Sequence, residues 1–209
     1  MIRILVVLLA SLVAASCAAM LHTNVAVTHA LPAMGSGKTV AIMPYTEGLS
    51  AAPDFQANAA KLAAHFQQKG YTAVAPSGGP APDYIAFFLY RIDRGTPVNT
   101  LEGRAHPETG SIISYGLRST FSASTHRIYM RAVTVEIVDR ARFRTNDSAS
   151  YLAARVYTGS VVSDGACSTM ASVIDPMLSA LFADFPGQSG GIRAIDVPAD
   201  TTCGMDRFG

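Results

Sequence analysis

The chain has 209 residues, of which 49% are hydrophobic and only 15% are charged, and its formal net charge is +1. This composition is that of a folded chain with a real core rather than a disordered one, and the length suits a single domain. A protein whose main partner is nucleic acid usually carries a clear basic excess, so the near-neutral charge argues against nucleic acid.

The first seventeen residues have the layout of a secretory signal peptide. Arg3 supplies a positive start and is followed by an unbroken run of apolar and small residues. This run is shorter than the ~20 residues that a membrane-spanning helix needs. We therefore predict that residues 1–16 are removed on export, that Cys17 begins the mature chain, and that residues 17–23 form a tether.

A cysteine directly after a cleavable leader is typical of a bacterial lipoprotein, in which the thiol carries diacylglycerol. Ala15 and Ser16 suit the lipobox, whereas Ala14 stands where leucine is usual. We expect Cys17 to be lipidated and to hold the protein at a membrane facing the periplasm, with the outer membrane preferred. The alternative is an ordinary secreted protein. Lipid chains contribute about 0.8 kcal/mol per buried CH₂ group, so two or three chains anchor a protein stably.

The first half of the mature chain alternates strands with one helix. Apolar residues at helical spacing predict a helix over residues 51–70, which Pro53 and Asp54 suit at its start and Gly70 at its end. Strands are expected at four places, of which the first two form a hairpin and the last, apolar on both faces, is central: residues 24–30, 39–43, 71–75 and 84–92.

Residues 35–39 read Gly-Ser-Gly-Lys-Thr and resemble the end of a phosphate-binding loop. The motif requires a glycine where Pro32 stands. It also requires a helix directly after Thr39, because the helix N-terminus helps to hold the phosphates. A β-branched strand is expected there instead, so we predict no nucleotide binding.

The middle of the chain begins with a stretch that has turn residues and no periodicity. We predict that residues 94–110 form a long loop, and loops of this length often carry function. Alternating apolar residues predict three further strands, with a polar connection between the last two: residues 111–122, 126–139 and 151–162.

A second helix is expected near the C-terminus. An apolar stripe covers residues 168–184, and Pro176 within it predicts a kink or break near Asp175. The order of elements predicts one α+β domain over residues 24–198, with a mixed, mainly antiparallel sheet and two helices packed on one face. Residues 199–209 are expected to form an extended tail.

Several stretches resemble one known family. They are residues 24–32 with their His-Ala-Leu-Pro, the helix end Gln-Gln-Lys-Gly-Tyr, residues 82–90 and, most specifically, Leu-Phe-Ala-Asp-Phe-Pro-Gly at residues 181–187. Together they resemble a family of small exported bacterial envelope lipoproteins catalogued as a domain of unknown function (family 4136). The resemblance implies a place in the envelope and a fold over most of residues 24–198. It assigns no catalytic residue.

Two cysteines remain in the mature chain besides Cys17. Cys167 and Cys203 lie in its last quarter, and in an oxidising compartment such a pair is expected to form a disulfide, the alternative being two free thiols. The loop that this bond closes is about 36 residues long, which gives roughly 3–4 kcal/mol in the chain-entropy model.

Two groups of polar residues are candidates for a binding site. Arg140, Arg142 and Arg144 stand at alternate positions and could grip a phosphate or an acidic sugar, the alternative being a solvated hairpin end. His106 has two glutamates nearby in the expected loop, but they lack the fixed helical spacing of a metal motif, so a solvated histidine is the simpler interpretation.

The sequence contains no Gly-x-Ser-x-Gly elbow and no other recognisable catalytic set. We therefore predict no enzyme activity and no cofactor or metal. The expected function is that of an envelope protein with a structural or accessory role, which binds a partner protein or a glycan. The alternative is a periplasmic hydrolase or ligand-binding protein that uses the loop at residues 94–110.

Overall fold

A computed structural model describes residues 20–30, 37–46, 48–107, 117–144 and 147–199. The strands in these ranges are β1 (Met20–His29), β2 (Thr39–Pro44), β3 (Thr72–Val74), β4 (Tyr84–Ile92), β5 (Thr96–Pro107), β6 (Leu117–Asp139), β7 (Arg155–Gly165) and β8 (Ile192–Pro198). The helices are α2 (Pro53–Gln68), α3 (Ser148–Ala154) and α4 (Ile174–Phe182), with short 3₁₀ turns η1 (Leu49–Ala51) and η2 (Met170–Ser172).

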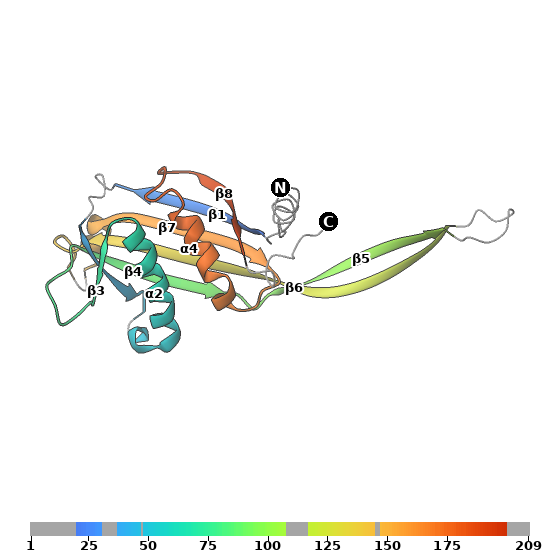
Figure 1. Ribbon diagram of the computed structural model, residues 1–209, viewed down its shortest axis with the longest axis horizontal. Coiled ribbons are helices and arrows are strands. Elements are labelled where there is room, and N and C mark those ends of the chain that lie inside the picture. Colours follow the sequence, from blue (N-terminus) through green and yellow to red (C-terminus); the bar gives the residue numbers. More distant parts are fainter. Residues whose placement is uncertain (1–19, 31–36, 47, 108–116, 145–146, 200–209) are drawn as a thin grey trace, which may run out of the picture.

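The strands form one mixed sheet (Figure 1) in the order β3-β2-β4-β6-β7-β1-β8, and β5 pairs with β6 beyond it. β2 runs parallel to both β3 and β4. The helix α2 is the crossover between the parallel strands β2 and β3. All other pairs are antiparallel. The prediction of an α+β fold with a mixed, mainly antiparallel sheet is confirmed.

The main core lies between the sheet and the two longer helices, α2 and α4. Leu62 and Phe66 of α2 and Met177 and Leu178 of α4 are fully buried in one cluster with alternate residues of the central strands. The Phe66 ring lies edge-on to Phe182, with centroids 5.1 Å apart. Burial of each such side chain contributes about 1.5–3 kcal/mol.

The third helix, α3, packs on the opposite face of the sheet. Ala154 at its end is buried with Ile85 and Val138 in a smaller cluster, against which the rings of Phe87 and Tyr151 pack. The count of two helices was therefore too low, because residues 151–154 were assigned to a strand. Asp147 caps this helix, since its side chain accepts a hydrogen bond from the Ala149 amide at 3.0 Å.

The loop predicted over residues 94–110 is wrong for residues 96–107, which form β5. Thr96 pairs with Ile128, and the register continues to Pro107 opposite Leu117. Pro97 is tolerated because β5 is an edge strand. Residues 108–116 lie outside the described residues. From Leu117 the chain continues as one strand to Asp139, where two strands were predicted.

Three further expectations differ from the structure. β1 and β2 form no hairpin, because β1 pairs with β7 and β8. β8 was not predicted, since the segment before the expected tail was assigned no strand. The second helix starts only at Ile174, after η2, so the break lies at Val173. Pro176 thus falls in the first turn of α4, where its missing N–H breaks no helical hydrogen bond. The tail at residues 200–209 lies outside the described residues.

Candidate functional site

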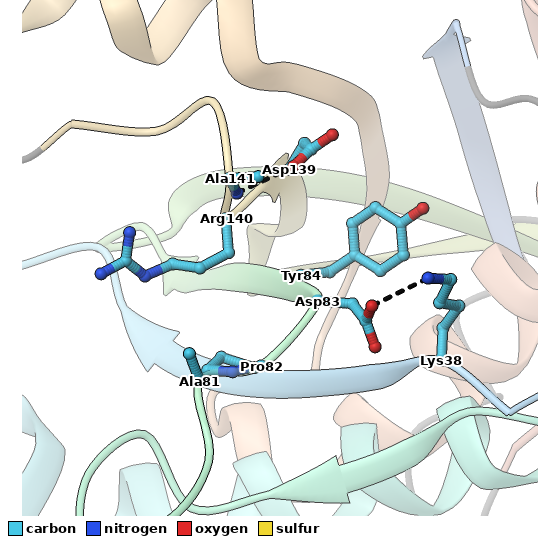
Figure 2. A pocket seen from close by; sticks show the side chains of 8 residues that line it. All are labelled: Lys38, Ala81, Pro82, Asp83, Tyr84, Asp139, Arg140 and Ala141. Carbon is cyan, nitrogen blue, oxygen red and sulfur yellow. Dashed lines mark hydrogen bonds and ion pairs between the residues drawn. The ribbon is translucent and has the colours of Figure 1, made fainter.

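An open pocket lies at the end of the sheet where β2 and β4 begin and β6 ends. Its volume is about 570 Å³, and Figure 2 shows the side chains that line it. The sheet brings these segments together because β2 is parallel and β6 antiparallel to β4. The lining residues are Lys38, residues 81–84 and residues 139–141.

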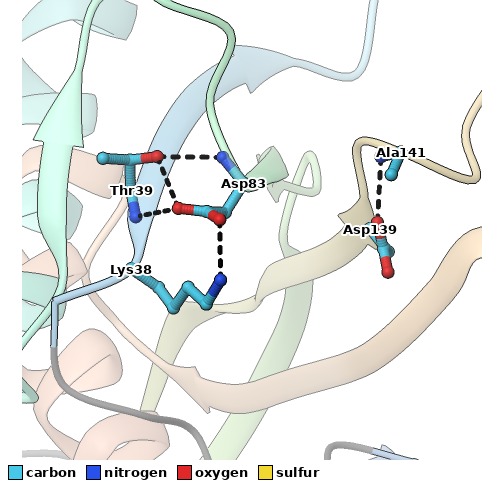
Figure 3. A network of polar contacts seen from close by, with 5 residues as sticks. All are labelled: Lys38, Thr39, Asp83, Asp139 and Ala141. Carbon is cyan, nitrogen blue, oxygen red and sulfur yellow. Dashed lines mark hydrogen bonds and ion pairs between the residues drawn. The ribbon is translucent and has the colours of Figure 1, made fainter.

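Asp83 connects the start of β2 to the start of β4 (Figure 3). Its carboxylate accepts hydrogen bonds from Lys38 Nζ at 2.8 Å and from the Thr39 amide and hydroxyl, each at 2.9 Å. The Asp83 amide in turn donates to Thr39 Oγ1 at 2.9 Å. The hydrogen bond from Lys38, with those from Thr39, lowers the pKa of Asp83 to about 2. Asp83 is therefore ionised and joins the start of β2 to the start of β4 through fixed hydrogen bonds. Such a carboxylate is poorly suited to proton transfer.

Lys38 and Thr39, at the end of the Gly-Ser-Gly-Lys-Thr segment, are among the described residues. Lys38 donates to Asp83, and Thr39 begins a strand rather than a helix. No helix N-terminus follows Thr39 to hold a phosphate.

The three arginines of the predicted anion site lie in and after the turn that follows β6. Arg140 lines the pocket and donates to the Phe143 carbonyl at 3.4 Å. Arg142 Nε lies 3.6 Å from Asp139 Oδ2, and the Arg144 amide donates to Ser150 Oγ at 2.8 Å. Each arginine thus has its own local contacts, and only Arg140 contributes to the pocket. An anion site on all three stays a prediction.

A second polar cluster lies under α3 on the sheet. Glu136 of β6 is buried, with 7% of its surface exposed. Its carboxylate accepts a hydrogen bond from the Tyr151 hydroxyl and another from Arg155 NH1 at 3.2 Å. Burial, with Glu136 nearby, raises the pKa of the Tyr45 phenol. This buried carboxylate is compensated by a cation and a phenol, which indicates a structural role.

Sequence reasoning missed this cluster because it assigned Glu136 and Tyr151 to two separate strands and gave no sign that α3 lies over the first of them. A smaller pocket of about 320 Å³ lies beside the cluster and is lined by residues 28–30, 152 and 155–158. His29 at its edge approaches the Gly187 carbonyl, with Nε2 2.9 Å from the oxygen.

Within the described ranges, no three histidine, cysteine, aspartate or glutamate residues gather as metal ligands would. The side chains of residues 102–107, which include His106, are not among those described. None of the helices in the described ranges is long and apolar enough to cross a membrane.

The predicted modification and cross-link fall largely outside the described residues. Cys17 and Cys203 both lie there, so lipidation and the disulfide stay predictions. Cys167 follows the end of β7 and packs at the margin of the main core.

No protein-family model and no curated protein matches the chain. Among solved structures, one similar chain is that of a PelC dodecamer from Paraburkholderia phytofirmans, with 17% identity and a TM-score of 0.42 over 77% of this chain and 95% of that one. Another is a PDZ domain protein from Parabacteroides distasonis, with 10% identity and a TM-score of 0.46 over 89% of this chain and 41% of that one. We draw no conclusion about function from either likeness.

Proposed function

We propose that the chain is an exported envelope protein, anchored by lipid at Cys17 to a membrane facing the periplasm, with an accessory binding role rather than a catalytic one. The leader layout of residues 1–17 supports export, and the cysteine that ends it supports lipidation. The strand β1 begins at Met20, so residues 20–23 of the tether predicted over residues 17–23 belong to the sheet, and Cys17 precedes this strand by three positions.

The accessory role is carried by one observation about the polar clusters. The acids at the centres of the two polar clusters, Asp83 and Glu136, are both held by partners within the fold. A general acid or base must reach the substrate and needs a pKa near the working pH. The pKa of Asp83, lowered to about 2, is far below neutral pH and does not meet the second requirement. These two carboxylates thus join neighbouring elements of the fold, which suits a binding scaffold.

The anchor is tested by fractionation of cells that produce the full chain. The wild type should incorporate labelled palmitate and stay with the envelope membranes, whereas Cys17→Ser should lose the label and accumulate as an uncut or soluble form. Cys167→Ser is the matched control and should keep both. A Cys17→Ser protein that remains in the membrane fraction as the mature species would show that the anchor is wrong.

The accessory role is tested on protein extracted from the membrane in mild detergent. An accessory subunit should elute with a second envelope component, protein or glycan, that is absent when the extract comes from cells lacking this chain. Elution of the chain alone after gentle cross-linking would contradict an accessory role.

A ligand-binding role is the second candidate, favoured by the pocket near Lys38. Its volume falls within the ~300–1,000 Å³ usual for ligand sites. Arg140 and Tyr84 both line it, while Lys38 and Asp83 neutralise each other across 2.8 Å. Arg140 would then attract an anionic group such as an acidic sugar. Galacturonate should raise the melting temperature of the wild type but not of Arg140→Ala.

A further inference from the structure

A two-stranded arm leaves one end of the sheet (Figure 1). We define the arm as residues 96–107, which form β5, and residues 117–128 of β6, which pair with them throughout. The other described partners of β6 begin only beyond the arm, with Tyr129 opposite Gly165 and Arg131 opposite Ile92. An isolated two-stranded hairpin is at best marginally stable in water, so the arm needs a further surface to pack on.

The register gives the arm two unlike faces. On the outer rungs, from the pair of Leu101 with Ala123 to the pair of Pro107 with Leu117, the positions of one face are occupied by Leu101, Gly103, Ala105, Pro107, Leu117, Ser119, Phe121 and Ala123. Nearer the sheet the same face carries the polar residues Asn99, Thr125 and Arg127. The alternate positions are occupied by Glu102, Arg104, His106, Arg118, Thr120 and Ser122. Leu101 is 76% exposed. The sequence pattern of these outer rungs is therefore amphipathic, and Leu101 and Ala123, the two members of the apolar set whose side chains are described, are both exposed.

The pairing places the start of the folded chain at the same end of the sheet as the base of the arm. β1 runs antiparallel to β7, with Asn24 opposite Val162, so Met20 lies level with the end of β7. That end, Gly165, pairs with Tyr129, and the arm begins at the next residue of β6. Cys17 precedes Met20 by three residues, which span at most about 11 Å. A lipid on Cys17 therefore holds the base of the arm close to the membrane surface.

We propose that the apolar face of the arm lies in the surface layer of the membrane to which Cys17 is anchored. The proposal rests on the lipid anchor of the proposed function. The polar positions of the outer rungs carry Arg104 and Arg118 against one acid, Glu102, and this basic excess suits anionic headgroups. Lipid and arm then form two points of attachment, which fix how the sheet stands on the membrane.

The chain contains no tryptophan, so a single introduced tryptophan reports one position. Leu101→Trp places it on the apolar face, and Ser124→Trp places it on the next rung of the arm but on the polar face. The full protein, purified from membranes, is reconstituted into vesicles of phosphatidylethanolamine and phosphatidylglycerol with plain or brominated acyl chains. Brominated chains should remove most of the emission of Leu101→Trp and little of that of Ser124→Trp.

Equal quenching of the two variants, or none, would overturn the proposal. A blue-shifted Leu101→Trp emission that brominated lipid leaves unchanged would also overturn it and would point to a second copy of the chain as the cover. Lipidation of Cys17 is measured separately, by mass spectrometry of the N-terminal peptide. A lipidated Cys17 with an unquenched Leu101→Trp rejects the arm alone, and an unmodified Cys17 with selective quenching rejects the anchor alone.

Discussion

Asp83 and Thr39 are joined by three hydrogen bonds, each of 2.9 Å: the Thr39 amide and hydroxyl donate to the Asp83 carboxylate, and the Asp83 amide donates to the Thr39 hydroxyl oxygen. This reciprocal contact fixes the register in which the parallel strands β2 and β4 start. The loss of the carboxylate charge should therefore weaken the sheet at this end.

The first prediction is that Asp83→Asn destabilises the protein by about 1 kcal/mol at neutral pH, a value reduced because the side chain is partly exposed. Since the pKa of Asp83 is lowered to about 2 in the folded state, its contribution is present above the ordinary value of about 3.9 and is lost as the pH falls towards 2. The difference from wild type in urea unfolding should thus shrink between about pH 4 and pH 2.

Asp184→Asn is the control for this measurement, because Asp184 makes one exposed ion pair with Arg193 at 2.9 Å. Its effect should stay within about 0.5 kcal/mol. An Asp83→Asn deficit that is the same at pH 7 and at acid pH would show that the charge of Asp83 does not matter.

The second prediction concerns Gly159 in β7, which has no room for a side chain. A Cβ there would lie 2.3 Å from the Tyr157 hydroxyl oxygen and 2.7 Å from Leu181 Cδ1. Tyr157 and Leu181 are both buried in the main core, so neither can move away freely. Gly159→Ala should cost about 1–3 kcal/mol of unfolding free energy, measured by urea denaturation.

Gly79→Ala is the matched control, because a Cβ at Gly79 meets nothing within 4 Å. Tyr157→Phe removes the closest atom and should recover part of the loss when combined with Gly159→Ala. Equal midpoints for Gly159→Ala and Gly79→Ala would contradict the close packing of β7 against α4.

Local sequence patterns correctly predicted the elements in which apolar residues recur at the positions that face the core. The range 84–92 matches β4, and the stripe of α2 buries Phe55, Leu62 and Phe66 as expected. The loop prediction for residues 94–110 was wrong because Pro97 and Gly103 are typical turn residues, although an edge strand tolerates them. Tyr151 was placed in a strand because its β-propensity outweighed the cap signal of Asp147.

The candidate site depends on pairings that cross long stretches of sequence. Asp83 and Lys38 lie 45 residues apart and meet only because β2 and β4 are parallel neighbours. Arg131 is fully buried although its residue type predicts exposure. The sequence around these residues indicates neither the contact between Asp83 and Lys38 nor the burial of Arg131, because the pairing of distant strands determines both. The sequence drew attention to Arg140 as one of three alternating arginines, of which it alone lines the pocket, and to Lys38 only as part of a phosphate-loop motif.

The third prediction is an energetic coupling between Glu136 and Tyr151. Glu136 is buried and accepts the Tyr151 hydroxyl, so removal of either partner leaves a buried polar group with fewer hydrogen bonds. Glu136→Gln and Tyr151→Phe should each cost about 1–3 kcal/mol, and the double variant should cost less than their sum. Ser150→Ala, beside Tyr151 on α3, does not touch Glu136 and should add independently to Glu136→Gln. Strict additivity of Glu136→Gln and Tyr151→Phe would contradict the contact.

The last prediction is the disulfide between Cys167 and Cys203. β7 and β8 flank β1 and both end near its start, since Pro198 pairs with Met20 and Asn24 pairs with Val162. Two strand spacings separate the ends, ~10 Å in all, and the five residues from Pro198 to Cys203 can span up to about 18 Å. The tail can therefore reach the segment just beyond β7.

The bond would fix the C-terminal segment against the core margin where Cys167 packs, and its reduction should cost roughly 3–4 kcal/mol. A non-reduced digest of protein taken from the oxidising compartment should contain the linked pair of peptides by mass spectrometry. Cys17→Ser should leave this pair unchanged, which excludes Cys17 as the partner. Recovery of Cys167 and Cys203 as separately alkylated peptides would reject the disulfide. Reduction would then leave the unfolding free energy of the wild type unchanged.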